Sequence, residues 1–477
     1  MLIMSDKYLA TIGLEIHAEL KTSSKMFCSC KNDPDEDRPN TNICPVCMGH
    51  PGTLPVLNKE AIKHVLKIGH AVNGNIADFT EWDRKNYFYP DIPKGYQISQ
   101  YKYPLVSGGS MAGVDITRIH LEEDTAQSTH DIHKKSLINF NRSGVPLMEL
   151  VTEPVIHDAV TAVKFAKELQ LLLRYLGAGE ANLEKGEMRV EANISVATIE
   201  NTNAKKFGTK TEVKNLNSFK SVEKAISYEI NRQIKQIESG EKVVQETRGW
   251  DDNSGKTYSQ RLKESSHDYR YFPEPDLPKL KISEVQEFEE NNLKKEMPEL
   301  PWVKRDRLQK EFGMTDKEIA VMVEAPEVGN YFEKVISNKK SIAKLTINYL
   351  LTDYLGIIKK ENVNLNSISE NNFAKLMIMI ENKKLSSRGA KDILLLMIKN
   401  NIDPEKIAIE NDLIQKSDEE EIKKIIEKII SENPSVVEDY KKGKVAALQF
   451  FVGQGMKATK GSANPEILKR IALEIIG

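Results

Sequence analysis

Four cysteines lie within one window of twenty residues, spaced as Cys-x-Cys and then Cys-x-x-Cys: Cys28, Cys30, Cys44 and Cys47. Two such pairs offer the four thiolates that a tetrahedral structural Zn²⁺ prefers. The segment between the pairs is polar and has little to bury, so a bound metal would supply the stability of its fold. Two disulfides, which a reducing cytosol disfavours, or four unrelated thiols are the alternatives. We therefore predict a structural zinc site over 28–47.

A second group of chemically capable side chains combines carboxylates with an imidazole. Glu149 stands at the centre of the apolar run VPLMELV, where a carboxylate must be paired, protonated or bound to a cation. Residues 122–124 are three consecutive acids after a strand-like segment, and they repel one another unless they share a cation. An oxygen-rich set with one imidazole suits Mg²⁺ or Mn²⁺ better than Zn²⁺. The set is Glu15, His17, Glu123, Glu149 and Glu191, and ordinary surface ion pairs are its alternative explanation.

Basic and aromatic side chains interleave at 83–101 and again at 268–275. Such a pattern can stack a nucleobase on a ring while cations contact phosphates. Tyrosines at the rim of a core would produce the same pattern. We keep both interpretations open from the sequence alone.

Strands must position the carboxylates. Apolar and polar residues alternate over 8–20, which predicts a strand with Glu15 and His17 on its non-core face. Residues 187–197 repeat this alternation and carry Glu191 on the open face. Two strands are therefore expected to present carboxylates away from the core.

Helices are predicted from about Asp158 to Gly177 and over 221–240, with strands and helices intermixed irregularly over the first 290 or so residues. This mixture favours an α+β fold with a mainly antiparallel sheet over a doubly wound sheet. Near Glu296 a proline-containing segment, MPELPWVKRDRL, is typical of a linker, and helical periodicity follows it.

Composition excludes several classes of protein. The chain of 477 residues has room for about three domains. Its 68 basic and 70 acidic side chains give a formal charge of −2, so only a local basic patch, and not the net charge of the protein, could attract a polyanion. No apolar run approaches the roughly 18 residues of a membrane span, and the amino terminus lacks signal-peptide features. Phosphate-loop, dinucleotide-binding, GxSxG and HExxH motifs are missing. We expect a soluble, cytoplasmic protein with neither membrane nor DNA as a partner.

Charge changes sign toward the carboxyl terminus. Acidic side chains outnumber basic ones ten to five over 403–434, whereas basic ones outnumber acidic ones seven to four over 436–477. The basic end is a candidate nucleic-acid contact, and an ordinary solvated helical face is the alternative.

Eight segments, read in order, resemble the GatB/GatE family of tRNA-dependent amidotransferase B subunits, and the resemblance covers the chain from end to end. Among them are IGLEIHAELKTSSKMFC, DRKNYFYPDIPKGYQISQY, RIHLEEDTAQSTH and NRSGVPLMELVTEP, at 12–28, 83–101, 118–130 and 141–154. The others are RVEANIS, FGTKTEVKNLNSF, DYRYFPEPDLP and GQGMKATKGSANP, at 189–195, 207–219, 268–278 and 453–465.

The resemblance implies an ATP-dependent carbon–nitrogen ligase that corrects misacylated tRNA. The side-chain carboxylate of Glu on tRNA(Gln), or of Asp on tRNA(Asn), would be phosphorylated by ATP and then amidated. Ammonia would come from glutamine that the A subunit, an amidase, hydrolyses, while the small C subunit would complete the heterotrimer. A zinc-stabilised, non-catalytic tRNA-binding protein is the competing hypothesis.

The resemblance also assigns roles to residues. It implies Mg²⁺ ligands at His17, Glu123 and Glu149, with Glu15, Glu191 and Glu212 around a channel mouth or a second cation. Glu191 stands where relatives often carry aspartate. Substrate or nucleotide contacts are expected from Arg84, Lys85, Asn86 and Tyr87, and tRNA contacts from Lys457, Lys460 and Lys469. Only some family members carry the zinc cysteines.

The resemblance implies three domains. A catalytic cradle domain with a mainly antiparallel sheet and flanking helices would span 1–296 and include the zinc-binding loop. Two all-α domains would follow, a helical connector at 297–405 and a YqeY-like tRNA-binding tail at 406–477.

Overall fold

A long, twisted sheet forms the centre of the N-terminal part of the computed structural model, which describes the chain except residues 1–6, 131–134, 263–268, 416–418, 445 and 460–462. Within the described residues the sheet has ten strands in the order β15-β14-β13-β12-β1-β11-β8-β6-β2, with β7 paired to β8. Neighbouring strands are antiparallel except β13 and β14. The strands are β1 (Tyr8–Glu19), β2 (Asn75–Ile76), β6 (Val106–Ser107), β7 (Ser110–Met111), β8 (Val114–Glu123), β11 (Pro146–Thr152), β12 (Met188–Thr198), β13 (Thr211–Leu216), β14 (Glu246–Asp251) and β15 (Lys256–Leu262).

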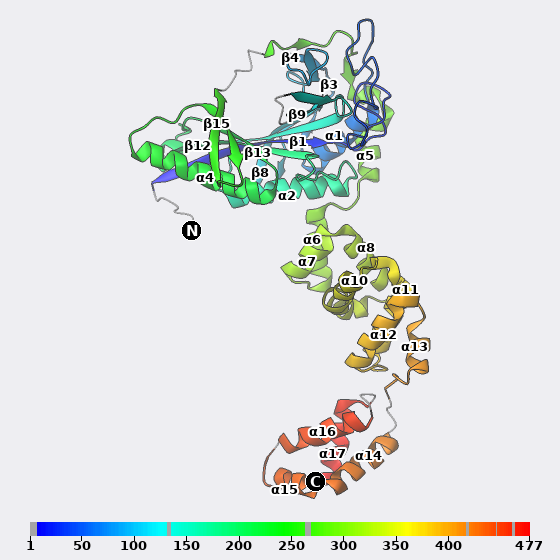
Figure 1. Ribbon diagram of the computed structural model, residues 1–477. Helices are drawn as coiled ribbons and strands as arrows, with labels where there is room; N and C mark the ends of the chain where they lie inside the picture. The colour runs from blue at the N-terminus through cyan, green and yellow to red at the C-terminus, as the bar shows by residue number, and fades with distance from the viewer. Residues whose placement is uncertain (1–6, 131–134, 263–268, 416–418, 445, 460–462) are drawn as a thin grey trace. The chain divides into compact units, whose positions relative to one another are not determined.

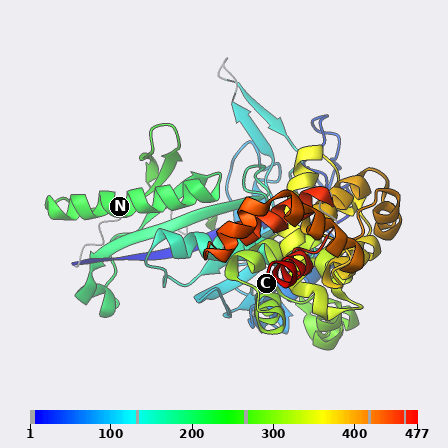
Figure 2. The same ribbon diagram turned by 90° about the horizontal axis from the view of Figure 1, so that it is seen from below.

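Strand alternation gives this sheet one apolar face. On β1, Ile12, Leu14 and Ile16 are at most 1% exposed, because they point toward the core. The helices α2 (Ala159–Tyr175) and α4 (Phe219–Glu238) contact each other and pack against β1 and β12 respectively. Figure 1 shows both helices along the same side of the sheet, and Figure 2 shows the green helix α4 running along the long strands. The opposite face of β1 is therefore left for polar side chains.

Smaller elements surround the sheet. A three-stranded sheet joins β4 (Asp83–Asn86), β5 (Tyr96–Ser99) and β16 (Phe272–Pro273), and two-stranded ribbons join β9 (Gln127–His130) to β10 (Ser136–Asn139) and β3 (Phe79–Thr80) to β17 (Leu280–Lys281). The remaining α-helices of this part are α1 (Lys59–Ala71), α3 (Ile199–Asn203) and α5 (Glu290–Glu296).

The chain packs as two units, Met1–Pro301 and Trp302–Gly477. The second unit is helical: α6 (Pro301–Phe312), α7 (Asp316–Glu324), α8 (Pro326–Ile336), α9 (Ala343–Asn348), α10 (Leu355–Glu361), α11 (Glu370–Glu381), α12 (Ser387–Asn400), α13 (Pro404–Glu410), α14 (Glu419–Glu432), α15 (Pro434–Lys441), α16 (Ala446–Ala458) and α17 (Pro465–Ile476). The helices α14, α16 and α17 share an apolar core around Ile426, Phe451 and Leu468.

The α+β prediction is confirmed, as is the mainly antiparallel sheet. The helix predicted from Asp158 is α2, where the Asp158 carboxylate accepts a hydrogen bond from the amide of Thr161. The helix predicted over 221–240 begins two residues earlier, because Ser218 caps α4 in the same way through Ser221. The three-domain division stays a prediction.

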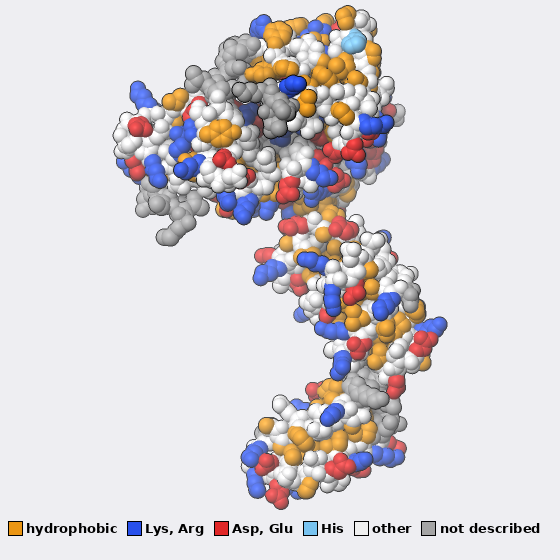
Figure 3. Space-filling view, in the orientation of Figure 1, with side chains coloured by type: hydrophobic (Ala, Val, Ile, Leu, Met, Phe, Trp, Pro, Cys, Tyr) orange, Lys and Arg blue, Asp and Glu red, His pale blue; other side chains and the backbone are white. Residues whose placement is uncertain are grey.

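The hydropathy of the helices and the distribution of surface charge can both be read from the structure. Among the described residues no helix is long and apolar enough to cross a membrane. Acidic and basic side chains are interspersed over both units in Figure 3, which agrees with the net charge of −2.

Candidate active site

Three adjacent strands bring one row of ionisable side chains together. In the antiparallel register, His17 on β1 lies opposite Glu149 on β11, and Glu149 lies opposite His120 on β8. Side chains directly opposite one another on antiparallel strands point to the same face. Glu15 and Glu122 lie two positions from members of this row, so they join the same face.

The side chains of this carboxylate row, defined as Glu15, His17, His120, Glu122 and Glu149, are close in space. The His17 Nε2 atom lies 3.3 Å from a Glu149 carboxylate oxygen, 3.6 Å from one of Glu122 and 3.9 Å from one of Glu15. The His120 Nε2 atom lies 3.5 Å from Glu149. Three carboxylates therefore surround one imidazole, and Glu149 joins the two histidines.

The electrostatics of the row are those of a crowded anionic site. Burial and the neighbouring Glu149 raise the pKa of Glu15 to about 7. Burial alone would lower the pKa of His17, but the hydrogen bond to Glu149 and the nearby carboxylates raise it to about 9. Burial lowers the pKa of His120. Without a metal, a protonated His17 thus neutralises part of the negative charge.

The donor set of the row fits a hard divalent cation. Ligand atoms of Glu15, His17 and Glu149 lie within 4.8 Å of one another, as do those of His120, Glu122 and Glu149. The buried Oε2 of Glu122 and Nδ1 of His120 have no hydrogen-bond partner among the residues that the structure describes. Carboxylate oxygens with one or two imidazoles match the preferences of Mg²⁺ or Mn²⁺.

A second acidic group lies beside the row. Ligand atoms of Glu15, Glu191 and Glu212 also lie within 4.8 Å of one another. Glu191 is opposite Glu15 in the β1–β12 register, and Lys214 on β13 lies 2.9 Å from the Glu191 carboxylate. Thr247 donates to Glu212 at 2.6 Å. Lys214 therefore neutralises one of the three carboxylates of this group.

The structure differs from the sequence-based expectation at Glu123. Its side chain points to the other face of β8, where it binds Lys94 and accepts a hydrogen bond from the amide of Ile98 at 2.9 Å. The expected trio of His17, Glu123 and Glu149 is therefore not brought together, and Glu122 lies beside His17 instead. Once the register with Glu149 places His120 on this face, the alternation of side chains along β8 places Glu122 there as well.

The residues expected to contact substrate or nucleotide lie on β4 or, in the case of Tyr87, directly after it. Arg84 and Asn86 form hydrogen bonds with the segment around 270. Arg84 forms a two-pronged ion pair with the buried Glu274, at 2.7 and 2.8 Å, so this carboxylate fixes its guanidinium. The Asn86 amide donates to the backbone carbonyl of Arg270 at 2.9 Å. Both residues therefore connect β4 to the segment around 270.

Lys85, in contrast, faces the carboxylate row. Burial lowers the pKa of Lys85, but the nearby Glu122, Tyr271 and Glu149 outweigh burial and hold it well above the usual value. Its ammonium lies 5.2 Å from the ring centre of Tyr269 and 6.0 Å from that of Tyr87. A permanent positive charge thus lies beside the row, enclosed by tyrosine rings.

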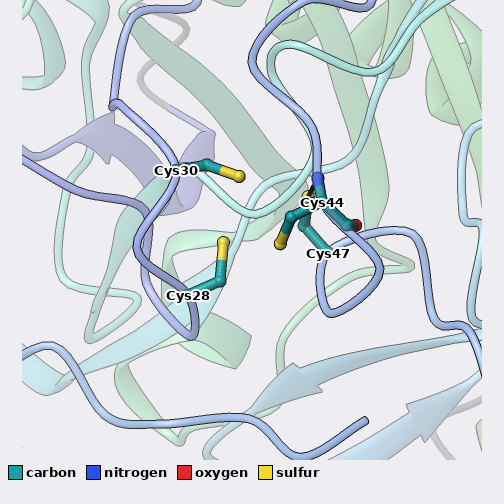
Figure 4. A group of neighbouring side chains, drawn as sticks. All are labelled: Cys28, Cys30, Cys44 and Cys47. Carbon is teal, nitrogen blue, oxygen red and sulfur yellow. Dashed lines mark hydrogen bonds between the residues drawn. The ribbon is translucent and has the colours of Figure 1, made fainter.

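The four cysteines converge, as Figure 4 shows for the side chains of Cys28, Cys30, Cys44 and Cys47. Their sulfur atoms lie within 4.8 Å of one another and form no disulfide. A tetrahedral ion with Zn–S bonds of about 2.3 Å needs sulfurs roughly 3.8 Å apart. A hydrogen bond from the Cys28 thiol is the main cause that lowers the pKa of Cys47 to about 5, so one thiolate is already favoured. The arrangement fits a closed, structural zinc site.

The expected tRNA contacts lie at the carboxyl terminus. Lys457, at the end of α16, and Lys469, on α17, are exposed. Lys460 lies outside the described residues.

The sequence was compared with models of known protein families and with known proteins. Residues 10–287 match the model of the GatB/GatE catalytic domain, and residues 330–476 match the model of the GatB domain. The B subunit of the aspartyl/glutamyl-tRNA(Asn/Gln) amidotransferase of Caldicellulosiruptor saccharolyticus is 44% identical over 485 residues, covering 98% of this chain and 99% of the relative. Proteins of the same name from Thermodesulfovibrio yellowstonii and Crocosphaera subtropica are 43% and 42% identical, with coverage of 98% or more on both sides.

Proposed function

The chain belongs to the GatB/GatE family, and we propose from this membership and from the carboxylate row that it is the B subunit of a tRNA-dependent amidotransferase. Its substrates would be Glu-tRNA(Gln), Asp-tRNA(Asn) or both. Its partners would be the A subunit, which is an amidase that hydrolyses glutamine, and the small C subunit.

The proposed reaction has two steps. An oxygen of the substrate's side-chain carboxylate bonds to the γ-phosphorus of ATP while the bond to the ADP oxygen breaks. Ammonia then attacks the carbonyl carbon of the acyl phosphate, inorganic phosphate leaves with that carboxylate oxygen, and a proton is lost to give the amide. The first step is needed because a carboxylate is a poor electrophile and phosphate is a good leaving group.

The observation that carries this proposal is the carboxylate row with Lys85 beside it. A site for phosphoryl transfer must hold two anions, ATP and a carboxylate, close to one another. Glu149, Glu122 and His17, with Glu15 next to them, are the residues that would hold Mg²⁺. Bound Mg²⁺ would neutralise charge on the phosphate oxygens.

Side chains of the protein would also stabilise the transferred phosphoryl group and orient the carboxylate of Glu149. The Lys85 ammonium, charged at neutral pH, offers positive charge to the transferred phosphoryl group. Arg118 lies 3.4 Å from Glu149 at the exposed side of the row and helps to fix the orientation of that carboxylate. His120, whose Nε2 atom lies 3.5 Å from Glu149, supports that carboxylate from the opposite side.

The cysteine site would have a structural role. Four protein thiolates leave no open position on a tetrahedral Zn²⁺, so the ion would hold the loop over 28–47 and take no part in the transfer. The helical carboxyl-terminal tail, with Lys457 and Lys469 exposed on it, would contact tRNA phosphates.

The proposal is tested by assembling the chain with its A and C partners and adding glutamine, Mg²⁺ and Glu-tRNA(Gln). We expect Gln-tRNA(Gln) only when ATP is present, and ADP formed in equal amount. Asp-tRNA(Asn) serves as a parallel substrate. A correctly assembled complex that forms neither amide would contradict the proposal and favour a tRNA-binding protein without catalysis.

A further inference from the structure

Five tyrosines form a continuous line of ring contacts that begins and ends at the surface. We name it the tyrosine track: Tyr89, Tyr87, Tyr269, Tyr271 and Tyr101. Ring centres are 6.0, 5.8 and 6.1 Å apart over the first three contacts, all edge-to-face. The last pair, Tyr271 and Tyr101, stacks in parallel at 4.3 Å with 9° between the planes. The two end residues are about half exposed, at 50% for Tyr89 and 52% for Tyr101.

The middle of the track adjoins the carboxylate row. Lys85 lies over the ring of Tyr269 and is also within electrostatic reach of Glu122 and Glu149. Tyr271 interacts electrostatically with the same lysine and carboxylates. The track therefore leads from solvent to the charged groups that would carry out phosphoryl transfer.

The exposed end of the track is held rigidly. The buried carboxylate of Asp83 accepts hydrogen bonds from the amides of Tyr101 and Lys102, at 3.0 and 3.3 Å. The strand β16, which follows Tyr271, pairs with β4. Tyr101 is half exposed, and the backbone on either side of the Tyr101–Tyr271 stack is held in place. Its ring is therefore a preformed platform, because little conformational entropy is lost when a ligand stacks on it.

The surroundings of the platform match a nucleic-acid strand. Lys102 and Arg270 are exposed cations next in sequence to Tyr101 and Tyr271, and Arg270 lies 5.8 Å from the ring of Phe88, which is 77% exposed. Figure 3 shows hydrophobic side chains gathered at the top of the first unit, over the region that holds β4 in Figure 1. Exposed rings with interleaved cations bind single strands, since bases stack on the rings while cations contact phosphates. Tyrosines that only rimmed a core would have no need of these cations.

We propose that the tyrosine track receives the unpaired 3′ end of the aminoacyl-tRNA, with a base stacked on the exposed face of Tyr101. The attached amino acid would then extend along the track toward Lys85 and the carboxylate row. This inference rests on the proposed function and identifies the surface that binds the acceptor end of its substrate. The adenine of ATP has the same stacking chemistry, so the experiment must separate the two sources.

The experiment uses the assembled complex and the variant Tyr101→Ala. Loss of one base–aromatic stack should raise the KM for Glu-tRNA(Gln) about tenfold, while the KM for ATP and kcat stay within about twofold. Tyr101→Trp and Tyr101→Phe keep a flat ring and should retain a KM near that of the wild type. Phe207→Ala is the matched control, because Phe207 is 47% exposed in the same unit but lies outside the track.

Each outcome decides between the alternatives. An unchanged KM for Glu-tRNA(Gln) in Tyr101→Ala overturns the inference, and so does a rise confined to the KM for ATP, which would assign the platform to the nucleotide. If the wild-type complex forms no amide, the proposed function fails instead. Binding of a fluorescent single-stranded RNA ending in CCA then tests the track separately, and equal affinity of wild type and Tyr101→Ala would overturn it.

Discussion

At the scale of single residues, the central feature is that Glu149 is shared by two histidines. Burial raises the pKa of Glu149, but His120 and His17 outweigh that effect and hold it well below the usual value, so it is ionised. An ionised carboxylate in an apolar strand needs positive charge nearby. In the protein alone, His17 and Lys85 supply it, and a divalent cation would take over part of this role.

The first prediction separates Glu122 from Glu123. Because Glu122 faces the carboxylate row and Glu123 pairs with Lys94 on the other face, Glu122→Gln should weaken Mn²⁺ binding by about tenfold or more. Glu123→Gln, the matched control, should change the Mn²⁺ affinity by less than about twofold. Titration calorimetry with Mn²⁺ measures both. A larger effect from Glu123 than from Glu122 would restore the ligand set that the sequence resemblance implied.

The second prediction concerns Glu149 itself. Glu149→Gln keeps the shape of the side chain but removes the charge that both histidines contact, so ATP-dependent amide formation should be abolished. Zinc content and tRNA affinity should remain those of the wild type, because the cysteines and the tail lie on other elements. Full activity in this variant would remove the carboxylate row from the mechanism.

Much of the site was predictable at this scale. The apolar context of Glu149 and the alternation around His17 identified both residues, and the spacing of the cysteines indicated their cluster. The choice between Glu122 and Glu123 was not, because three consecutive acids carry no sign of which one faces the row. That choice depends on the register of β8 against β11, a contact between segments some thirty residues apart.

At the scale of elements, the loop over 28–47 depends on side chains more than on regular structure. It has no helix or strand among its described residues, apart from the bridge of Ser24 to Lys31 near its start. The sequence predicted this dependence from the loop's polarity, because such a segment buries too little apolar surface to stay folded unaided.

The third prediction follows for this loop. Cys44→Ser removes one thiolate, so the zinc content should fall well below one ion per chain and the thermal midpoint should fall by several degrees. Thr41→Ser in the same loop is the control and should keep both values. Elemental analysis and calorimetry measure them. A variant with full zinc content would show that Cys44 is not a ligand.

The fourth prediction concerns the hairpin of β14 and β15. Burial raises the pKa of Glu246, but hydrogen bonds from Ser259 and Arg248 outweigh burial and lower it below the usual value. A lowered carboxyl pKa adds stability above pH 4.5, and this contribution is lost as the pH falls through the folded-state value. Glu246→Gln should therefore reduce the free energy of unfolding at pH 7 by about 1–3 kcal/mol.

Urea denaturation at several pH values tests this expectation. The difference between wild type and Glu246→Gln should shrink as the pH falls below 4.5, because the wild-type carboxyl becomes neutral as well. Glu241→Gln, at an exposed position just before the strand, should have little effect at any pH. A difference that is constant with pH would mean that packing and not charge explains the effect.

At the scale of the whole molecule, the two units divide the proposed work. The first unit holds the carboxylate row, the tyrosine track and the cysteine site, whereas the second is built of helices. The sequence predicted this change from a sheet-rich unit to a helical one. The spacing of apolar residues changes from the two-residue period of strands to the helical period after the proline-containing segment near Glu296. The tyrosine track was only half visible in the sequence, because its halves, 87–101 and 269–271, meet through β4 and β16.

The tail can be removed at a boundary that the structure defines. The amide of Gln415 donates to the carbonyl of Lys384, and Ile414 forms a bridge with Leu385, so the chain up to 415 packs with the helices before it. The helices α14, α16 and α17 have a core of their own. Deletion of 416–477 should therefore leave the rest of the chain folded, with unchanged zinc content.

The fifth prediction is the salt dependence of tRNA binding. If Lys457 and Lys469 contact phosphates, then replacing both by alanine should weaken tRNA binding and reduce the slope of log affinity against log salt by about two. Deletion of 416–477 should reduce the slope at least as much. Lys423 and Lys424, exposed on the acidic helix α14, are the matched controls, and their alanine variants should keep the wild-type slope. Because the slope counts released counterions, it separates a loss of phosphate contacts from a general loss of affinity, and an unchanged slope after deletion would place the tRNA contacts elsewhere in the chain.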